Sequence, residues 1–171
     1  CWAWRRVPVP VVAAVHGHCY GGGLQIALAA DLRMTTADAQ WSVLEAKWGL
    51  VPDMSGIQAL SQQVRMDVAK RLTMTGEVVS GERAVDLGLA SEVHADPVAA
   101  ATAFIEQVAT RSPDAVAATK RLFGRTWSSS DRRTFARERI EQAKLLATKN
   151  TTIAREAAMK RAVPAFDPRR R

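Results

Sequence analysis

The chain has 171 residues, 47% of them hydrophobic and 24% charged, with a formal net charge of +7. A chain of this length and composition folds into a domain with a core of its own, which excludes an intrinsically disordered or collagen-like protein. Its only two cysteines, Cys1 and Cys19, exclude a disulfide framework and indicate a reducing, cytoplasmic location.

The first forty residues have the pattern of an α/β unit. Residues 7–15 (VPVPVVAAV) are apolar and β-branched, which predicts a short buried strand whose prolines lie near its start. This longest apolar stretch is too short for a membrane helix, which needs about 20 residues, so we expect no membrane association. Residues 16–23 predict a glycine-rich turn, residues 24–30 a buried helix and residues 31–36 a second strand.

Short elements continue as far as residue 93. A mixed pattern over residues 40–50 predicts a short strand and a loop, and residues 52–61 predict a helix that begins at a proline. Two further helices are expected, over residues 65–74 before a glycine and over residues 80–87, where a serine is a favourable cap. Residues 89–93 predict another short strand.

The pattern is helical from residue 97 onward, because apolar residues recur with helical spacing over residues 97–111, 113–123, 131–148 and 151–161. The positive charge is concentrated there: residues 111–171 contain 16 Lys and Arg against 6 Asp and Glu, whereas residues 1–110 contain 8 against 11. Such a region could face nucleic acid, an anionic cofactor or an acidic subunit, or it could be a solvated helical surface.

Three glycines, Gly21, Gly22 and Gly23, precede the predicted helix of residues 24–30. Glycines let the backbone approach a ligand closely, and the free N–H groups at a helix start attract an anionic oxygen. The pattern fits an oxyanion-binding turn, and it fits a purely structural tight turn equally well. The residues that would define a P-loop or a dinucleotide-binding fingerprint are absent.

Two carboxylates are candidates for chemistry. Glu45 has apolar neighbours, with Trp41 and Trp48 on either side, and such surroundings suit a general acid or base; the alternative is a surface glutamate. Asp53 follows Pro52 at the predicted start of a helix, where it could simply interact with the helix dipole. The three histidines form no compact ligand pattern with cysteine or carboxylate, so we expect no metal site.

A family resemblance is carried by residues 7–53, which read VPVPVVAAVHGHCYGGGLQIALAADLRMTTADAQWSVLEAKWGLVPD. This stretch resembles the crotonase superfamily, also called the enoyl-CoA hydratase/isomerase family, and the resemblance continues into the basic C-terminal helices. It implies an α/β fold in which residues 1–96 form part of a crotonase-type ββα superhelical core, as its C-terminal half. Residues 97–171 would then form a helical oligomerisation region, through which the family assembles homo-trimers or hexamers.

The family binds acyl-CoA thioesters and holds an enolate in an oxyanion hole of two backbone N–H groups. By resemblance Gly22 supplies one of them. The other belongs to an N-terminal portion that we expect to be missing, because the chain starts at Cys1 and not at Met. The implied partner is an acyl-CoA, as substrate and not as cofactor, and nucleic acid is not expected. The resemblance implies substrate-binding positions at Tyr20, Gly21, Gly23, Trp48 and Pro52.

The resemblance also implies catalytic positions at Gln25, Glu45 and Asp53. Hydratases of the family use two glutamates; Gln25 stands where the first is expected, and Glu45 matches the second. Members with one glutamate shift a double bond. Dienoyl-CoA isomerases add an aspartate at the position of Asp53 but carry an acidic residue where Gln25 stands, so that match is partial.

The sequence thus predicts isomerisation of an enoyl-CoA or dienoyl-CoA through a thioester enolate, with Glu45 as the acid/base. Three alternatives stay open. The first is an enoyl-CoA hydratase, which adds water in fatty acid β-oxidation. The second is a catalytically inactive crotonase fragment, and the third is a nucleic-acid-binding module based on the basic C-terminal region.

Overall fold

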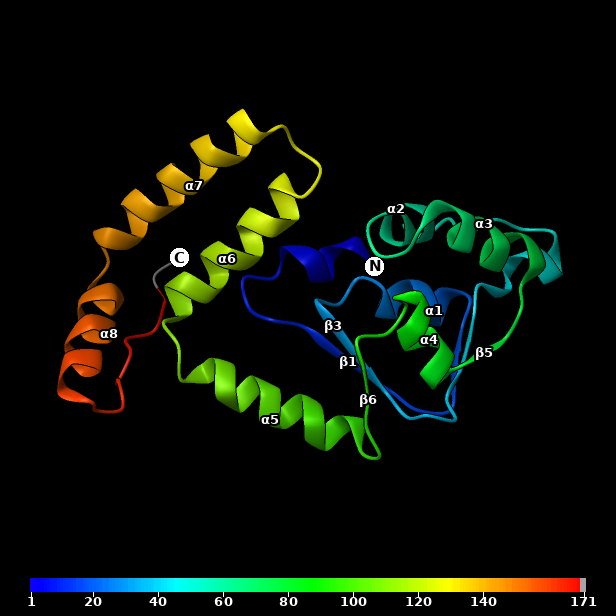
Figure 1. Ribbon diagram of the computed structural model, residues 1–171, viewed down its shortest axis with the longest axis horizontal. Helices are drawn as coiled ribbons and strands as arrows, with labels where there is room; N and C mark the ends of the chain where they lie inside the picture. Colours follow the sequence, from blue (N-terminus) through cyan, green and yellow to red (C-terminus); the bar gives the residue numbers. More distant parts are fainter. Residues whose placement is uncertain (170–171) are drawn as a thin grey trace. The chain divides into compact units, whose positions relative to one another are not determined.

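The computed structural model describes residues 1–169 (Figure 1). The chain forms two compact units, which we describe separately. The core unit contains residues 1–5 and 11–103, and the helical unit contains residues 6–10 and the chain from residue 104 onward. The division falls inside helix α5 (Pro97–Ala109). The division into domains at residues 96 and 97 stays a prediction.

Two small sheets organise the core unit. In the first, with the strand order β1-β3-β6, all neighbours are parallel. In the second, with the order β2-β4-β5, β2 and β4 are parallel and β5 is antiparallel to β4. The strands are β1 (Val12–Val15), β2 (His18–Tyr20), β3 (Leu32–Thr35), β4 (Gln40–Ser42), β5 (Val79–Ser80) and β6 (Glu92–Val93).

The chain passes from one sheet to the other twice in the same way. β1 and β2 follow each other directly but belong to different sheets, and β3 and β4 repeat this step after helix α1 (Gly22–Ala27). As a result β3 pairs with β1, with Val12 opposite Leu32, and β4 pairs with β2, with Tyr20 opposite Ser42. This strand, strand, helix repeat places the segments that follow β2 and β4 at the same edge of the second sheet.

Short helices complete the core unit. α2 (Gly56–Ser61) and α3 (Met66–Thr75) lie side by side, and α4 (Gly81–Leu87) packs against β5 and β6 (Figure 1). The 3-10 helices η1 (Trp2–Arg6) and η2 (Leu44–Trp48) precede β1 and follow β4. The core contains fully buried side chains from the sheets and the helices. One of them is Trp41, whose indole N–H donates to Thr35 Oγ1 at 3.1 Å. Burial of these apolar groups is the main stabilising contribution to the unit.

Most predicted elements are present, and several differ, including η1, η2 and β5, which the sequence does not predict. The strand expected over residues 7–15 is confined to β1, because Pro8 and Pro10 have no N–H to donate to a ladder. The helix expected over residues 52–61 begins only at Gly56, because Ser55 adopts a left-handed conformation with φ 71° that interrupts helical geometry. β2 lies within the segment that was expected to be a turn only.

The helical unit contains α6 (Pro113–Thr126), α7 (Asp131–Leu146) and α8 (Lys149–Lys160). In the described part of the chain no strand follows β6, as the sequence predicts. α6 and α7 pack against each other, and the buried Glu141 of α7 accepts hydrogen bonds from the Arg121 guanidinium of α6, with Nε at 3.1 Å from Oε1. This hydrogen bond lowers the pKa of Glu141 below its ordinary value, against the opposing effect of burial.

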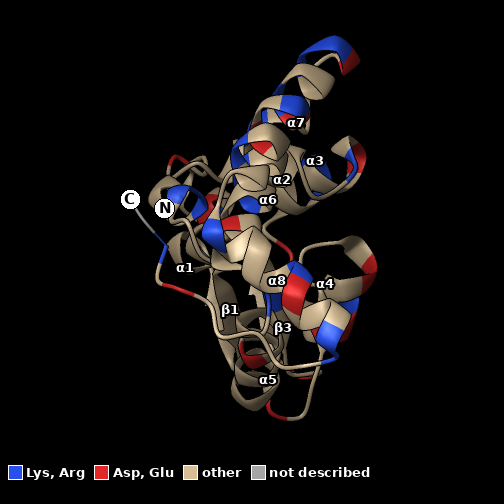
Figure 2. Ribbon diagram, turned by 90° about the vertical axis from the view of Figure 1, so that its left-hand side faces the viewer, with Lys and Arg blue, Asp and Glu red and all other residues tan. Residues whose placement is uncertain are grey.

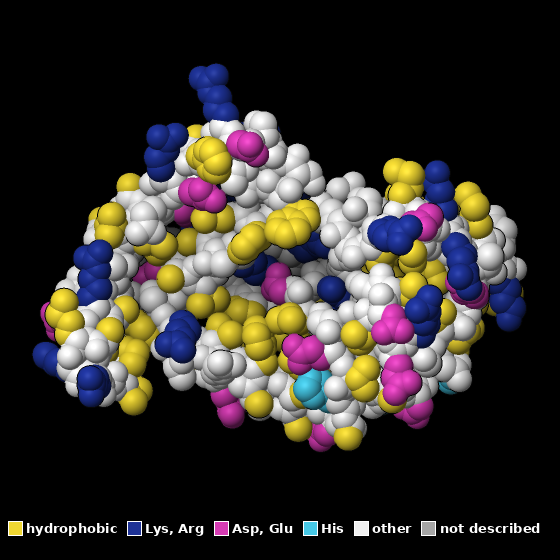
Figure 3. Space-filling view, viewed as in Figure 1, with side chains coloured by type: hydrophobic (Ala, Val, Ile, Leu, Met, Phe, Trp, Pro, Cys, Tyr) yellow, Lys and Arg dark blue, Asp and Glu magenta, His cyan; other side chains and the backbone are white. Residues whose placement is uncertain are grey.

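Lys and Arg residues recur along the ribbon of α7 and α8 (Figure 2), and Lys and Arg side chains stand out on the surface shown in Figure 3. Most of the basic residues of these helices are exposed, in agreement with the charge of the C-terminal sequence. In residues 1–169 we find no helix that combines the length and the apolarity needed to cross a bilayer.

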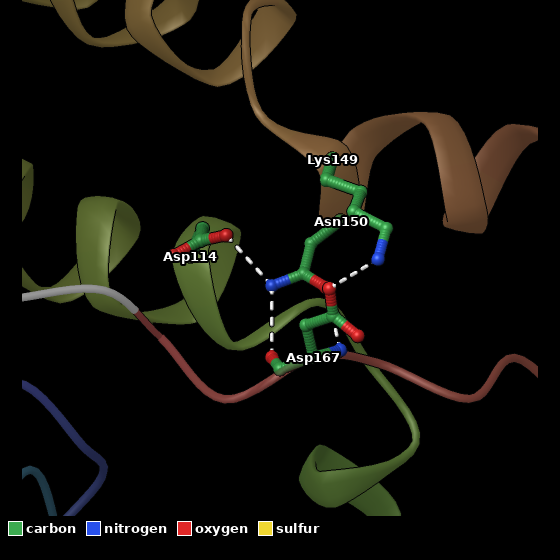
Figure 4. Close-up of polar contacts among 4 residues, drawn as sticks. All are labelled: Asp114, Lys149, Asn150 and Asp167. Carbon is green, nitrogen blue, oxygen red and sulfur yellow. Dashed lines mark hydrogen bonds and ion pairs between the residues drawn. The ribbon is translucent and has the colours of Figure 1, made fainter.

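One buried side chain ties together three parts of the helical unit (Figure 4). Asn150, at the start of α8, donates from Nδ2 to Asp114 Oδ2 at 2.8 Å and to the Asp167 carbonyl at 3.1 Å. Its Oδ1 accepts from the Asp167 N–H at 2.9 Å, and Lys149 pairs with the Asp167 carboxylate at 2.6 Å. The side-chain amide of Asn150 thus pairs with both the N–H and the carbonyl of Asp167. This holds the segment around Asp167 beside the start of α6.

Candidate active site

The pairing of β2 with β4 brings two distant segments together. Tyr20 is opposite Ser42, and the N–H of Gly21, the residue that follows β2, donates to the Ser42 carbonyl at 3.1 Å. α1 starts directly after this bond, and η2 starts two residues after Ser42. Ligands of α/β proteins bind at the carboxyl ends of parallel strands, which is where these two segments begin.

Gly21 makes the turn into α1. Its φ of 48° and ψ of −119° are conformations that only glycine adopts readily, and a Cβ there would lie 3.5 Å from Glu45 Oε1. The first hydrogen bond of the helix runs from the Gln25 N–H to the Gly21 carbonyl at 3.0 Å. The N–H groups of residues 22–24 therefore have no partner within the helix, as at every helix start.

Gln25 and Glu45 are joined by a short hydrogen bond. Gln25 Nε2 donates to Glu45 Oε1 at 2.6 Å, although the two residues are twenty positions apart. The Gln25 side chain is fully buried, at 1% exposure, whereas Glu45 is half-buried. The other carboxylate oxygen, Glu45 Oε2, is shielded from solvent and has no hydrogen-bond partner in the described part of the chain.

A third segment completes the group. Gln25 Oε1 accepts from the Met54 N–H at 2.8 Å and from the Gly56 N–H at 2.9 Å. A side-chain carbonyl oxygen has two lone pairs, so these two bonds use the whole acceptor capacity of Gln25. Its amide can therefore have only one orientation, with Nε2 directed at Glu45.

The segment before α2 is shaped to fit the Gln25 amide. A Cβ at Gly56 would lie 2.7 Å from Gln25 Oε1 and 2.8 Å from the Cβ of the buried Pro52, too close for any larger residue. Ser55, between the two N–H donors, is held in its left-handed conformation and makes no capping hydrogen bond. Its Oγ is buried and has no partner among residues 1–169.

The structure therefore brings together only some of the positions that the sequence singled out. Gln25, Glu45, Gly21 and Pro52 take part in the contacts above, and Gly22 lies beside Met54, whose Sδ would be 3.4 Å from a Cβ at that glycine. Gly23 follows in the first turn of α1, with open space where a Cβ would be.

The other predicted positions lie apart from this group. Asp53 is exposed, and within residues 1–169 its carboxylate makes no hydrogen bond to Gln25 or Glu45. Trp48 is 68% exposed, with the Lys47 ammonium 5.8 Å from its ring centre. The half-buried Tyr20 donates its hydroxyl hydrogen bond to Gln40. Sequence reasoning missed the two backbone donors Met54 and Gly56, although the Ser-Gly pair inside a predicted helix is a turn signal.

A family model described as enoyl-CoA hydratase/isomerase matches residues 3–167, almost the entire chain. The chain belongs to the enoyl-CoA hydratase/isomerase family. This confirms the resemblance that residues 7–53 carry and the α/β fold expected from it.

Similar members of the family are known from several bacteria. The (E)-benzylidenesuccinyl-CoA hydratase of Thauera aromatica is 39% identical over 114 residues, covering 65% of this chain and 44% of the relative. The carnitinyl-CoA dehydratase of Proteus mirabilis (strain HI4320) is 33% identical over 119 residues, covering 68% and 46%. The crystal structure of an enoyl-CoA hydratase from Polaromonas sp. JS666 is 30% identical, with a TM-score of 0.90 over 96% of this chain and 65% of that one. The chain thus spans less than half the length of the curated relatives it matches.

Proposed function

We propose that the protein shifts a carbon–carbon double bond in an acyl-CoA thioester, with Glu45 as the group that removes and returns the proton. One observation carries this proposal. Both lone pairs of Gln25 Oε1 are taken by the Met54 and Gly56 N–H groups, and by the family resemblance Gln25 stands at one of the two positions expected for a carboxylate. Gln25 therefore has no atom that can accept a proton or orient the hydrogens of an attacking water.

The reaction needs one base that changes its protonation state twice. In a 3-enoyl thioester the hydrogen on C2 is acidic, because its removal delocalises the electron pair over the thioester carbonyl and the double bond. Glu45 takes this proton, and the double bond moves to C2–C3 as the same carboxyl group returns a proton to C4. Atoms and charge balance without water, and no cofactor is required.

The carbonyl oxygen of the thioester carries the negative charge in the enolate intermediate. The N–H of Gly22, the first residue of α1, precedes the first hydrogen bond of that helix and is our candidate for one donor to this oxygen. Gly22 follows the turn residue Gly21, which lies against Glu45 Oε1. The candidate donor therefore directly follows the turn residue that lies against the base.

Asp53 has a smaller role in this proposal. Its carboxylate is exposed and is separate from the hydrogen-bonded group of Gln25 and Glu45. A second acid would matter when a proton must return to a carbon farther along the chain, as in a dienoyl thioester. We therefore expect substitution of Asp53 to affect dienoyl substrates more than simple 3-enoyl substrates.

Hydration of a 2-enoyl-CoA is the second candidate. The names of the relatives from Thauera aromatica and Proteus mirabilis, a hydratase and a dehydratase, favour it. Addition of water with Glu45 alone would lack the second carboxylate, and each general acid or base typically contributes about 10²–10⁴-fold to a rate. On this argument isomerisation is the faster of the two reactions.

The experiment is an assay of 3-enoyl-CoA conversion in D₂O. The products are separated by chromatography and identified by mass spectrometry. It is run on this chain and on a longer chain extended at the N-terminus to the family length, since the second oxyanion donor is expected there. We expect the 2-enoyl product, with loss of about 10²–10⁴-fold in rate for Glu45→Gln and no loss for the exposed control Glu82→Gln. A 3-hydroxyacyl product formed faster than the isomer would contradict the proposal.

Self-association is also part of the proposed function. α6 and α7 border an open groove of about 460 Å³, and three aromatic side chains on it are more than half exposed, Phe123, Trp127 and Phe135. Exposed apolar clusters of this kind commonly bind another protein. We expect a trimer or hexamer by light scattering at micromolar concentration, and a clean monomer of the longer chain would contradict this.

A further inference from the structure

We propose that Gln25 is a positioning residue that holds Glu45 by Oε1 and leaves Oε2 as the oxygen that exchanges protons with the substrate. This inference rests on the proposed role of Glu45. It goes beyond that role by assigning the two carboxylate oxygens different tasks and by giving the Gln25 amide a function.

The two oxygens of Glu45 are not equivalent. Oε1 accepts the 2.6 Å hydrogen bond from Gln25 Nε2 and lies against the Gly21 turn. Oε2 has no hydrogen-bond partner among the described residues, and it is shielded from water. A buried oxygen without a partner is rare in proteins and costly, and such costs are typical of functional groups. A substrate that reaches Oε2 would meet the carboxylate oxygen that has no hydrogen-bond partner among the described residues.

The direction of the Gln25 amide is set by the backbone and not by Glu45. The Met54 and Gly56 N–H groups both donate to Gln25 Oε1. If the amide were turned over, the –NH₂ group would face two N–H donors and a carbonyl oxygen would face the Glu45 carboxylate. Both contacts would be repulsive, so the segment of residues 54–56 orients Glu45 through Gln25.

Gly56 has a place in this arrangement although it is far from the carboxylate along the chain. Its N–H is the first of α2, and the first helical hydrogen bond runs later, from the Ala59 N–H to the Ser55 carbonyl at 2.9 Å. The Gly56 N–H therefore has Gln25 as its partner and not the helix. The absence of a Cβ lets Gln25 Oε1 approach to hydrogen-bonding distance.

Hydrogen exchange measured by NMR on the chain as it stands tests the geometry without any activity. We expect the Met54 and Gly56 amides to exchange at least tenfold more slowly than the amide of the exposed Ile57, which belongs to the same helix start. In Gln25→Met this protection should be lost, while the Ala59 amide stays protected as an internal control. Equal exchange of Gly56 and Ile57 in the unaltered chain would overturn the proposal.

Kinetics of the longer chain test the positioning role. Gln25→Glu keeps an acceptor for both backbone N–H groups but has no N–H to donate to the ionised Glu45. It should therefore keep slow exchange at Met54 and Gly56 and lower kcat about tenfold to hundredfold, with KM unchanged within about twofold. The reaction followed is isomerisation of a 3-enoyl-CoA, because a carboxylate at position 25 would add a catalytic group of its own to hydration.

The two proposals fail in different ways. If Gln25→Glu keeps the full kcat of a reaction that Glu45→Gln abolishes, Gln25 does not position Glu45 and this inference is wrong. If the exchange pattern is found but the unaltered protein hydrates a 2-enoyl-CoA faster than it isomerises a 3-enoyl-CoA, the geometry of this inference stands and the proposed isomerisation is wrong.

Discussion

Gln25 Nε2 donates a hydrogen bond of 2.6 Å to Glu45 Oε1, and this contact links a helix that follows β2 to a 3-10 helix that follows β4. The contact exists because β2 and β4 are parallel neighbours, so that residues twenty positions apart leave the sheet at one edge. It is then fixed by two N–H donors from a third segment, Met54 and Gly56. The chemistry proposed for Glu45 depends on these three segments together.

The fit between Gly56 and Gln25 predicts the effect of one added methyl group. Gly56→Ala would place a Cβ 2.7 Å from Gln25 Oε1 and 2.8 Å from the Pro52 Cβ. We expect the free energy of unfolding to fall by about 1–3 kcal/mol, as for other overpacked sites. Gly23→Ala, with open space around its Cβ, is the control and should be neutral or stabilising. Equal stability of both variants in urea would show that Gln25 is not held closely by this segment.

Replacing Ser55 should change stability in the opposite direction to Gly56→Ala. Its left-handed backbone, with φ 71°, is about 1 kcal/mol less favourable for an L-residue than for glycine. Ser55→Gly should therefore raise the thermal midpoint of the core unit. Ser61→Gly, at the end of α2, should lower it, because glycine is a poor helix former. A lowered midpoint for Ser55→Gly would mean that the serine hydroxyl contributes a stabilising contact.

Asn150 predicts a stability effect in the helical unit. Asn150→Ala removes three hydrogen bonds and leaves the Asp167 N–H and the Asp114 carboxylate without this partner. We expect a loss of about 2 kcal/mol in the free energy of unfolding, measured by circular dichroism in urea. Thr152→Ala, an exposed change on the same helix, is the control. A loss no larger than that of the control would contradict the account of Figure 4.

The pair of Arg121 and Glu141 predicts a dependence of stability on pH. The hydrogen bond from Arg121 lowers the pKa of Glu141 in the folded state. A carboxylate with a lowered pKa stabilises the fold above its ordinary pKa, and this contribution is lost as the pH falls through the folded-state pKa. Glu141→Gln should therefore flatten the acid side of the stability curve, whereas Glu156→Gln, which is exposed, should not. Parallel curves for Glu141→Gln and the unaltered chain would contradict the pairing.

Local signals in the sequence predict many of the helices correctly. Ser80 caps α4 through its side chain, and Gly76 and Gly88 end α3 and α4 in the left-handed conformation, as their residue types indicate. The interruption at Ser55 has only the weak local signal of the Ser-Gly pair. It depends on the hydrogen bonds that the Met54 and Gly56 N–H groups donate to Gln25, which lies 29 and 31 residues earlier in the chain.

The candidate site was predictable in part, and the reason is again the range of the interactions. The glycine turn and Glu45 stand out by residue type and by family resemblance. Their contact depends on the pairing of β2 with β4, and β2 has only three residues inside a glycine-rich segment that carries a turn signal. The sequence does not reveal the role of Gln25, because only the structure shows that its amide connects its own helix to Glu45 and to the segment of residues 54–56.

The roles proposed for Glu45 and Gln25 are tested most directly by the ratio of two rates in the longer chain. The kcat/KM for isomerisation of a 3-enoyl-CoA is compared with that for hydration of the matching 2-enoyl-CoA, in the unaltered protein and in Gln25→Glu. The account predicts that isomerisation exceeds hydration by about 10²-fold or more in the unaltered protein, and that Gln25→Glu raises hydration by restoring a second carboxylate. Hydration as fast as isomerisation with Gln25 in place, or full isomerisation in Glu45→Gln, would contradict it.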